Sequence, residues 1–227
     1  VEQVRLGMGA DQRIGNAFLY PGAGYGGSCF PKDVRALIAT GADSGVEMSI
    51  LRAVDERNER QKRSLFDKLQ AYFGKVGGLR VALWGLAFKP GTDDIREAPA
   101  VTLIGQLLDA GAVVCAYDPV AADNIRSRFE HHPARTRLQI ADQQYVAVNV
   151  ADALVLVTEW KRFRQPDFRS LQLAMRGRLI VDGRNQYDPA YLRRIGFDYI
   201  AIGRDNRRLR AGVFQSSASE MRVNTQQ

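Results

Sequence analysis

Residues 79–117 read LRVALWGLAFKPGTDDIREAPAVTLIGQLLDAGAVVCAY. The stretch holds a short apolar segment at 81–84, a polar loop, an apolar-rich helical segment at 98–110 and a second apolar segment at 113–117. Two strands joined by a helix predict a parallel pair, because parallel strands need a long crossover connection. We therefore expect a βαβ unit here.

The same alternation continues to residue 202. We expect further strands at 138–140, 153–157, 179–181 and 199–202, and helices at 121–129, 143–149, around 171–175 and at 189–194. Strands that are apolar along their whole length are typical of a sheet covered on both faces. The sequence predicts an α/β fold with a doubly wound, mostly parallel, Rossmann-like sheet.

The chain before residue 77 looks helical instead. We expect helices at 1–8, from 30 onward until Gly41 to Gly45 break it, and at 47–73, with a loop at 11–29 between the first two. The long helix carries a stripe at spacings of three and four, in which Asn58 and Gln61 interrupt the apolar residues: Leu51, Val54, Asn58, Gln61, Leu65, Leu69 and Tyr72. Such a helix can pack on a domain or on its copy in a second subunit.

The predicted division is therefore a central helical dimerisation segment at 1–76, an α/β domain at 77–203 and a basic tail at 204–227. The 227 residues carry a net charge of +7, from 32 Lys+Arg and 25 Asp+Glu. Much of the excess lies in the tail, at Arg204, Arg207, Arg208, Arg210 and Arg222. Because the tail is poor in large apolar residues, a solvated or disordered segment is favoured over a nucleic-acid-binding arm.

Composition also bears on whether the protein binds a membrane, contains disulfides or binds a metal. No apolar run approaches the roughly 20 residues of a membrane helix, so we expect no membrane partner. The two cysteines, Cys29 and Cys115, lie in different contexts, which favours free thiols in a reducing, cytoplasmic compartment. His131 and His132 are adjacent without other candidate ligands nearby, so we expect no metal site.

The run Gly24-Tyr25-Gly26-Gly27-Ser28-Cys29-Phe30-Pro31-Lys32-Asp33 carries the clearest chemical signal. It places a cysteine at the exit of a glycine-rich loop, where a helix begins and Lys32 is near, and this setting favours a thiolate. Asp33 follows one helical turn later. This pattern indicates a cysteine nucleophile with an attendant carboxylate, although a free cysteine is more often a small buried hydrophobe, as we expect for Cys115.

Residues 22–27 also match G-x-G-x-x-G, but no strand precedes them and Pro31 follows, so we reject a dinucleotide fingerprint. The strand at 81–84 is followed by Gly85-Leu86-Ala87-Phe88-Lys89-Pro90, which is neither that fingerprint nor a Walker A loop. The expected sheet thus shows no standard NAD-binding turn of its own.

Charged residues follow two of the expected strands, at Lys89 to Arg96 and at Arg184. One interpretation is that they lie in solvated surface loops without a binding role. Because carboxyl ends of parallel strands share one edge, they can also form a clamp for a phosphorylated ligand, with Lys89 as a point charge and Arg96 or Arg184 as a planar fork.

Several separated blocks together resemble the UDP-glucose/GDP-mannose dehydrogenase family over residues 11–203. They are Asp11-Gln12-Arg13-Ile14-Gly15, the cysteine run, Gly85 to Pro90 with Thr92 to Glu97, Tyr117-Asp118-Pro119, Thr158-Glu159-Trp160 and Asp182-Gly183-Arg184-Asn185. At the position after the cysteine, Phe30 resembles the residue found in the enzymes that act on UDP-glucose. The enzymes that act on GDP-mannose tend to carry Leu at that position. UDP-glucose is therefore the first expectation and GDP-mannose the alternative.

The resemblance implies an NAD-dependent, two-step oxidation of UDP-glucose to UDP-glucuronate, a precursor of surface polysaccharide. Cys29 would trap the intermediate aldehyde as a thiohemiacetal, a second oxidation would give a thioester, and water assisted by Asp33 would release the product. The loop of Tyr20, Pro21, Gly22, Ala23, Gly24, Tyr25 and Gly26 would line the sugar nucleotide together with Phe88, Lys89 and Arg184.

The resemblance also implies that Cys29, Lys32 and Arg96 face the NAD, and that Arg13 reaches the substrate of a neighbouring subunit in a homodimer built on the long helix. The family's amino-terminal NAD-binding domain is not in the sequence, so we expect little turnover from this chain alone. A non-catalytic UDP-sugar-binding and dimerisation fragment is the alternative from another functional class.

Overall fold

The computed structural model describes residues 1–204. The helices are α1 (Glu2–Gly9), α2 (Phe30–Asp43), α3 (Ser49–Phe73), α4 (Pro99–Asp109), α5 (Ala122–Arg128), α6 (Gln144–Ala147), α7 (Phe168–Ala174) and α8 (Pro189–Arg194). The strands are β1 (Arg80–Trp84), β2 (Val113–Tyr117), β3 (Leu138–Ile140), β4 (Ala153–Leu156), β5 (Leu179–Asp182) and β6 (Asp198–Ala201). The predicted basic tail lies outside the described residues except for Arg204, whose guanidinium donates to the Tyr187 carbonyl at 3.0 Å.

The six strands form one sheet in the order β3-β2-β1-β4-β5-β6, and every neighbouring pair is parallel. This order reverses direction between β1 and β4, as in doubly wound nucleotide-binding folds. The predicted fold class is confirmed, with all strands found within one or two residues of their expected positions. Ligands of such sheets bind beyond the carboxyl ends of the strands at the reversal, which are the ends of β1 and β4.

Alternate residues of each strand feed two separate cores. Helices α3, α4 and α5 cover one face, where Leu83 and Val155 are fully buried. Helices α6, α7 and α8 cover the other face, where Trp84 stacks on Phe163 with ring centroids 5.1 Å apart. Burial on both faces explains why the strands are apolar along their whole length.

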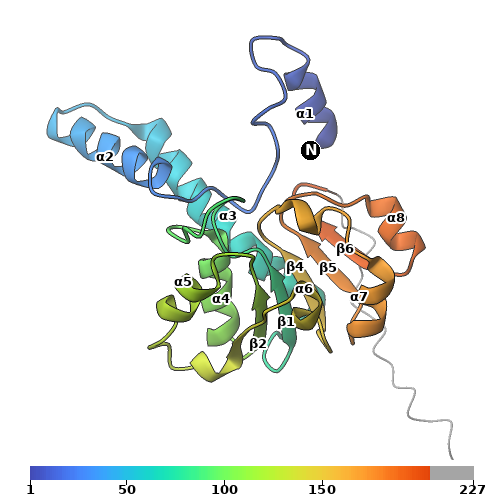
Figure 1. The fold of residues 1–227 in the computed structure, drawn as a ribbon. Helices are drawn as coiled ribbons and strands as arrows, with labels where there is room; N and C mark the ends of the chain where they lie inside the picture. Colours follow the sequence, from blue (N-terminus) through green and yellow to red (C-terminus); the bar gives the residue numbers. More distant parts are fainter. Residues whose placement is uncertain (205–227) are drawn as a thin grey trace, which may run out of the picture.

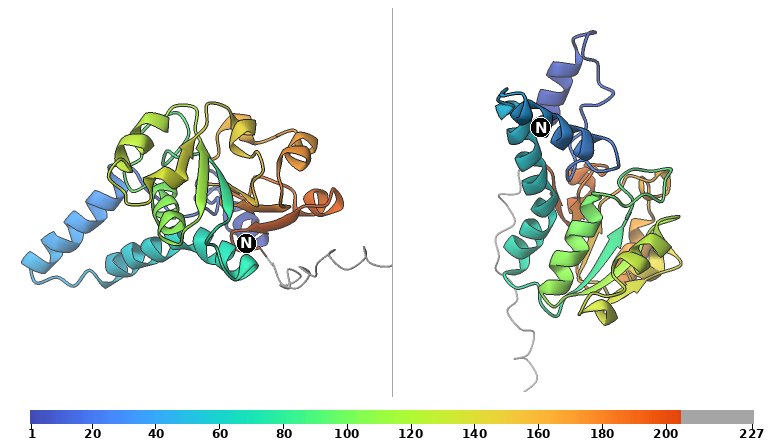
Figure 2. Two further views of the ribbon diagram at one scale, coloured as in Figure 1. Left: turned by 90° about the horizontal axis from the view of Figure 1, so that it is seen from below. Right: turned by 90° about the vertical axis from the view of Figure 1, so that its left-hand side faces the viewer.

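The amino-terminal helices extend away from this body (Figure 1). The carboxyl half of α3 packs beside α4 on the sheet through Leu65 and Leu69, whereas α2 and the start of α3 project outward as a helical pair (Figure 2). Helix α1 lies apart from both, and Val1 reaches the Gly203 carbonyl with its amino group at 3.3 Å. One long helix thus links the sheet to the segment that carries Cys29.

The expected helix break between Gly41 and Gly45 is confirmed, because α2 ends at Asp43, inside that range. A Cβ at Gly41 would lie 2.5 Å from Met48 Cγ and 2.9 Å from the Val46 carbonyl oxygen. The glycine therefore allows the following turn to fold back closely on α2. The helix ends at Ser44, and Gly45 adopts a φ of 70°, which suits a helix end.

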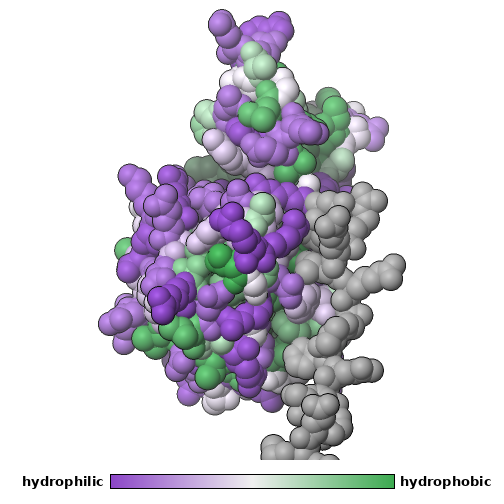
Figure 3. Space-filling model, turned by 90° about the vertical axis from the view of Figure 1, so that its right-hand side faces the viewer, coloured by the Kyte–Doolittle hydropathy of each residue, from purple (hydrophilic) through white to green (hydrophobic). Residues whose placement is uncertain are grey.

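The face with α7 and α8 is mostly hydrophilic, with scattered hydrophobic spots on the body and on the narrow part above it (Figure 3). Val4, Leu6 and Met8 of α1 are exposed hydrophobic residues. Over residues 1–204, no helix has the length and apolar character needed to cross a membrane.

Candidate functional site

A cavity of about 970 Å³ lies between the glycine-rich loop, the first turns of α3 and the carboxyl edge of the sheet. Seven of the predicted site residues line it: Tyr20, Gly22, Gly24, Tyr25, Gly26, Phe88 and Arg184. Its other walls include Phe18, Phe30, Ile50, Arg57, Asn58 and Gln61. Aromatic walls with a few cationic and amide groups suit a ligand that has both a flat ring and a negative charge.

Two polar residues of α3 hold the loop in place. The side chain of Asn58 accepts from the Tyr25 amide at 2.8 Å and donates to the Tyr25 carbonyl at 3.0 Å. Gln61 donates to the Gly22 carbonyl at 2.7 Å. These residues were not among the predicted site residues, yet their interruption of the apolar stripe was the signal that could have found them.

Two positions in the loop require glycine because other parts of the chain approach its backbone too closely for a side chain. A Cβ on Gly26 would lie 2.4 Å from the Glu97 carbonyl oxygen, and one on Gly27, whose φ is 90°, would lie 2.8 Å from the Phe88 ring. The Gly27 amide also donates to the Arg96 carbonyl at 2.8 Å. The loop therefore lies flat against residues 96–97, which precede α4.

We expect Gly26→Ala to destabilise the fold by about 1–3 kcal/mol, because the added methyl group would meet backbone that cannot move independently. Gly105→Ala is the matched control, since Gly105 lies in α4 with nothing within 4 Å of its added Cβ. That change should leave stability equal or higher. Urea unfolding of the two variants measures the difference, and equal stabilities would contradict the close approach.

Arg184 occupies the carboxyl end of β5 and separates this cavity from a smaller polar one of about 650 Å³. Its guanidinium donates to Glu159 Oε1 at 2.5 Å, and its backbone amide donates to Asp182 Oδ1 at 2.9 Å. A Cβ on Gly22 would lie 2.6 Å from Arg184 Nη1, so the guanidinium lies directly on the loop backbone. Arg184 is thereby placed to contact a negatively charged ligand in the cavity.

Cys29 is the residue before α2, and its side chain is exposed and accessible to reagents. Its Sγ lies 3.6 Å from Ser28 Oγ. Lys32 and Asp33 are both exposed on the first turn of α2 and pair with each other, at 3.3 Å between Nζ and Oδ1. Phe30, the residue after Cys29, lines the cavity, so Cys29 adjoins a residue of the cavity wall.

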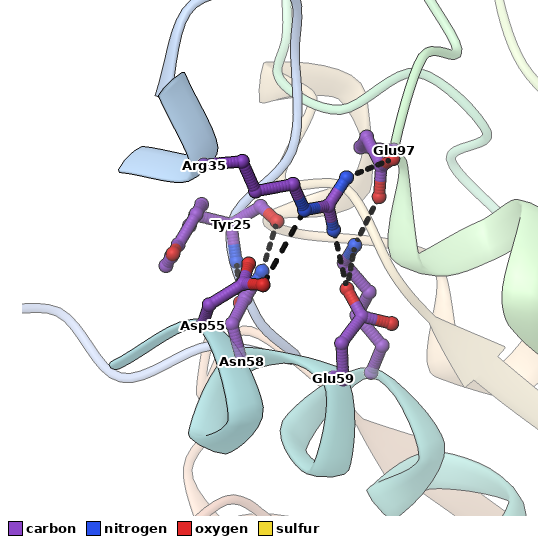
Figure 4. Close-up of polar contacts among 7 residues, drawn as sticks. Tyr25, Arg35, Asp55, Asn58, Glu59 and Glu97 are labelled. Atoms are coloured by element: carbon purple, nitrogen blue, oxygen red, sulfur yellow. Dashed lines mark hydrogen bonds and ion pairs between the residues drawn. The ribbon is translucent and has the colours of Figure 1, made fainter. Parts of the chain in front are cut away.

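A polar cluster joins α2, α3 and the segment before α4 (Figure 4). Glu97 accepts from Lys62 at 2.5 Å and from Arg35 at 3.0 Å. Arg35 reaches down from α2 and also pairs with Asp55 and Glu59 of α3, each at 3.3 Å. We call these five residues the interhelix cluster.

Charges within the interhelix cluster stabilise one another. Hydrogen bonds from Lys62 and then Arg35 lower the pKa of Glu97. Burial alone would lower the pKa of Lys62, which is 1% exposed, but its hydrogen bonds to Glu59 and Glu97 outweigh burial and the net pKa is raised. Lys62 therefore stays charged although its side chain is buried. Sequence reasoning did not select Lys62 or Glu97 as site residues.

The remaining predicted residues lie outside the cavity walls. Lys89 is exposed with its ammonium 5.3 Å from the Phe88 ring centroid, and Arg13 is exposed and paired with Asp11 at 2.5 Å. Arg96 is exposed and paired with Asp94 at 2.7 Å. Pro21 is half-buried and Ala23 is 1% exposed, so both support the loop from within.

The turn after β1 does not suit a dinucleotide. The amides of Leu86 and Ala87, which could otherwise cradle a phosphate, donate to Asp118 Oδ2 at 2.7 and 3.3 Å. The Trp160 indole donates to the same oxygen at 3.1 Å. A carboxylate that uses these donors excludes a pyrophosphate there, in line with the expectation that this sheet has no NAD-binding turn.

Comparison with known proteins identifies the relatives of this chain. Residues 1–60 match the central domain of the UDP-glucose/GDP-mannose dehydrogenase family, and residues 82–189 match its UDP binding domain. A UDP-glucose 6-dehydrogenase of Pseudomonas aeruginosa is 54% identical over 220 residues, which are 96% of this chain and 48% of that protein. Another, of Rhizobium meliloti, is 42% identical over 90% of this chain and 46% of that protein.

Among solved structures, a UDP-glucose dehydrogenase of Pyrobaculum islandicum is 34% identical with a TM-score of 0.71, over 80% of this chain and 39% of that one. The chain spans about half the length of the curated relatives it matches. Both family models and the shared architecture agree with the resemblance drawn from the separated sequence blocks. The chain belongs to the UDP-glucose/GDP-mannose dehydrogenase family.

Proposed function

We propose that this chain is the part of a UDP-glucose 6-dehydrogenase that binds the sugar nucleotide and supplies its nucleophile. One observation carries the proposal: the glycine-rich loop that lines the cavity with Arg184 leads directly into Cys29 at the start of α2. Arg184 would bind the diphosphate, and the aromatic walls would hold the flat base. The sugar would then point toward Cys29, the residue before the cavity-lining Phe30.

The proposed chemistry uses Cys29 as a covalent catalyst. Its sulfur would add to the C6 aldehyde of the half-oxidised sugar, forming an S–C bond while the proton passes to the aldehyde oxygen. After the second oxidation, the thioester would be split by water into a carboxylate and the free thiol. Asp33, exposed one turn along α2, would orient that water.

NAD, when bound, would supply the oxidising power by accepting a hydride at each of the two oxidations. In this chain, two exposed cations would face the pyrophosphate of NAD: Lys32, three residues after Cys29, and Arg96, whose carbonyl accepts from the Gly27 amide. Because the amides of the turn after β1 already donate to Asp118, this turn is a poor site for NAD. We therefore propose that NAD approaches Cys29 from the exposed side of α2.

We also propose a homodimer built on α3, with Arg13 reaching the partner's substrate. The support is a set of exposed apolar residues on the helical pair of α2 and α3 and on the loop before it. Phe18 is 99% and Ile50 78% exposed, accompanied by Phe30, Leu37, Val46 and Val54. Such a set favours burial against a second copy. Sedimentation equilibrium should give twice the chain mass, and a monomer at micromolar concentration would contradict this. Two free thiols support a reducing, cytoplasmic location.

Calorimetric titration of this chain with UDP-glucose tests the proposed substrate class, with GDP-mannose as the parallel ligand. We expect UDP-glucose to bind at micromolar to millimolar affinity and GDP-mannose to bind more weakly. A preference for GDP-mannose would move the assignment to the other named substrate of the family. If neither ligand binds, the proposed nucleotide site is wrong for this chain.

A further inference from the structure

Helix α2, which begins directly after Cys29, buries little apolar surface. Of its 14 residues two are buried, Pro31 and Gly41, and Leu37 is 49% exposed. The helix projects from the sheet together with the first part of α3 (Figure 2). Because apolar contacts stabilise a helix position roughly in proportion to the area they bury, they do little to fix the direction of α2.

Arg35, in the second turn of α2, supplies polar contacts instead. Each of its three guanidinium nitrogens has a different carboxylate acceptor: Nε donates to Asp55 and Nη2 to Glu59, each at 3.3 Å, and Nη1 donates to Glu97 at 3.0 Å. Asp55 and Glu59 lie one turn apart on α3, whereas Glu97 belongs to the segment before α4 (Figure 4). A planar group bound at three corners to two elements fixes direction as well as distance.

Two of these acceptors are themselves held by a buried cation. Lys62, whose side chain is 2% exposed, donates to Glu59 at 2.8 Å and to Glu97 at 2.5 Å. Lys62 bonds Oε2 of Glu97, which leaves Oε1 for Arg35. Both carboxylates are therefore held in place for Arg35, which reduces the side-chain entropy that exposed ion pairs usually lose.

The same two elements also hold the glycine-rich loop of the cavity. Asn58, which bonds both backbone groups of Tyr25, lies on α3 between Asp55 and Glu59. The Glu97 carbonyl oxygen would lie 2.4 Å from a Cβ on Gly26, so the loop backbone rests on that residue. The cavity loop and the helix after Cys29 are thus attached to neighbouring positions of the chain.

We propose that Arg35 is a positioning residue that sets the direction of α2 and so holds the Cys29 thiol at a fixed place relative to the cavity loop. The inference rests on the proposed role of Cys29 as nucleophile. In that role the sulfur must lie close to the aldehyde carbon, and a displacement of about 1 Å can cost about 100-fold in rate. Without the three ion pairs, α2 takes several directions and Cys29 moves with it.

A distance measurement tests this placement without any ligand. Cys29 is exposed and Cys115 is 3% exposed, so a nitroxide reagent labels Cys29, and Ser127→Cys on α5 adds a second label on the sheet domain. Double electron–electron resonance on labelled chain diluted with unlabelled chain should give one narrow distance distribution. Arg35→Met keeps the apolar stem without the charge and should broaden or shift that distribution, and Arg35→Lys should give an intermediate change.

Arg52→Met is the matched control for the loss of one positive charge. Arg52 is exposed on α3, and among residues 1–204 it takes part in no ion pair, so the distribution should stay as in the unchanged chain. Three results would overturn the proposal: a broad distribution in the unchanged chain, no change in Arg35→Met, or an equal change in Arg52→Met.

A second measurement separates positioning from a general loss of structure. Arg35→Met should bind UDP-glucose as the unchanged chain does, because Asn58 and Gln61 hold the loop independently. The equilibrium constant for hemithioacetal formation with the bound 6-aldehyde of UDP-glucose, measured by NMR of ¹³C at C6, should fall roughly fivefold, which is the effect of a partly exposed ion pair at the strong end of the usual range.

An unchanged adduct constant in Arg35→Met, or a parallel loss of UDP-glucose affinity, would also overturn the positioning role. If the unchanged chain forms no adduct at all, the proposed nucleophile is wrong. The label distances still decide in that case whether Arg35 fixes α2, so the two failures can be told apart.

Discussion

Cys29→Ser should abolish a covalent adduct between this chain and the 6-aldehyde of UDP-glucose. The thiol adds to an aldehyde because a thiolate is readily formed and strongly nucleophilic, whereas a serine hydroxyl needs an adjacent base. In the structure, the hydrogen-bonding neighbour of Sγ is the Ser28 hydroxyl at 3.6 Å, which is not a base. With aldehyde labelled by ¹³C at C6, NMR should show a hemithioacetal carbon in the unchanged chain and none in the variant.

Cys115→Ser is the matched control for this experiment. Cys115 lies in β2 with 3% exposure, so its loss should leave the adduct signal unchanged. An adduct that persists in Cys29→Ser would contradict the nucleophile assignment. So would the absence of an adduct in the unchanged chain under conditions where calorimetry detects UDP-glucose binding.

The sheet could be predicted because its determinants are local. Strands such as β4, Ala153 to Leu156, are apolar throughout and separated by helical segments of ordinary length, and this pattern has few structural solutions. A helix was expected around 171–175, and α7 spans Phe168 to Ala174. Its start is set by the Asp167 side chain, which accepts from the amides of Arg169 and Ser170.

The cavity could be predicted in part, for a physical reason. A glycine-rich loop and an arginine that follows a strand are visible as motifs, so Gly22 and Arg184 were selected. Asn58 and Gln61 act only when α3 folds against a loop more than thirty residues earlier, and Lys62 acts only when it meets Glu97, 35 residues later. A single sequence does not encode these pairings locally. Lys89 was selected by charge, yet its side chain lies over Phe88 outside the cavity wall.

The second large effect is expected at Arg184. Arg184→Ala should weaken UDP-glucose binding roughly 10- to 100-fold, because a charge-assisted hydrogen bond to a phosphate contributes about 1.5–3 kcal/mol. Arg184→Lys should give an intermediate loss, since an ammonium keeps the charge without the planar fork. Calorimetric titration measures each affinity. Arg126→Ala removes the same charge from an exposed pair with Asp123 on α5 and should bind as the unchanged chain does.

Arg184→Ala also leaves the Glu159 carboxylate without its partner, and that carboxylate could repel a diphosphate by itself. Both side chains are 22% exposed, so the repulsion would be only partly screened. The variant Arg184→Ala/Glu159→Gln separates the two causes. If Arg184 binds the phosphates directly, the double variant should bind nearly as weakly as Arg184→Ala. Recovery of the original affinity would mean that Arg184 acts mainly to neutralise Glu159, and that another group binds the phosphates.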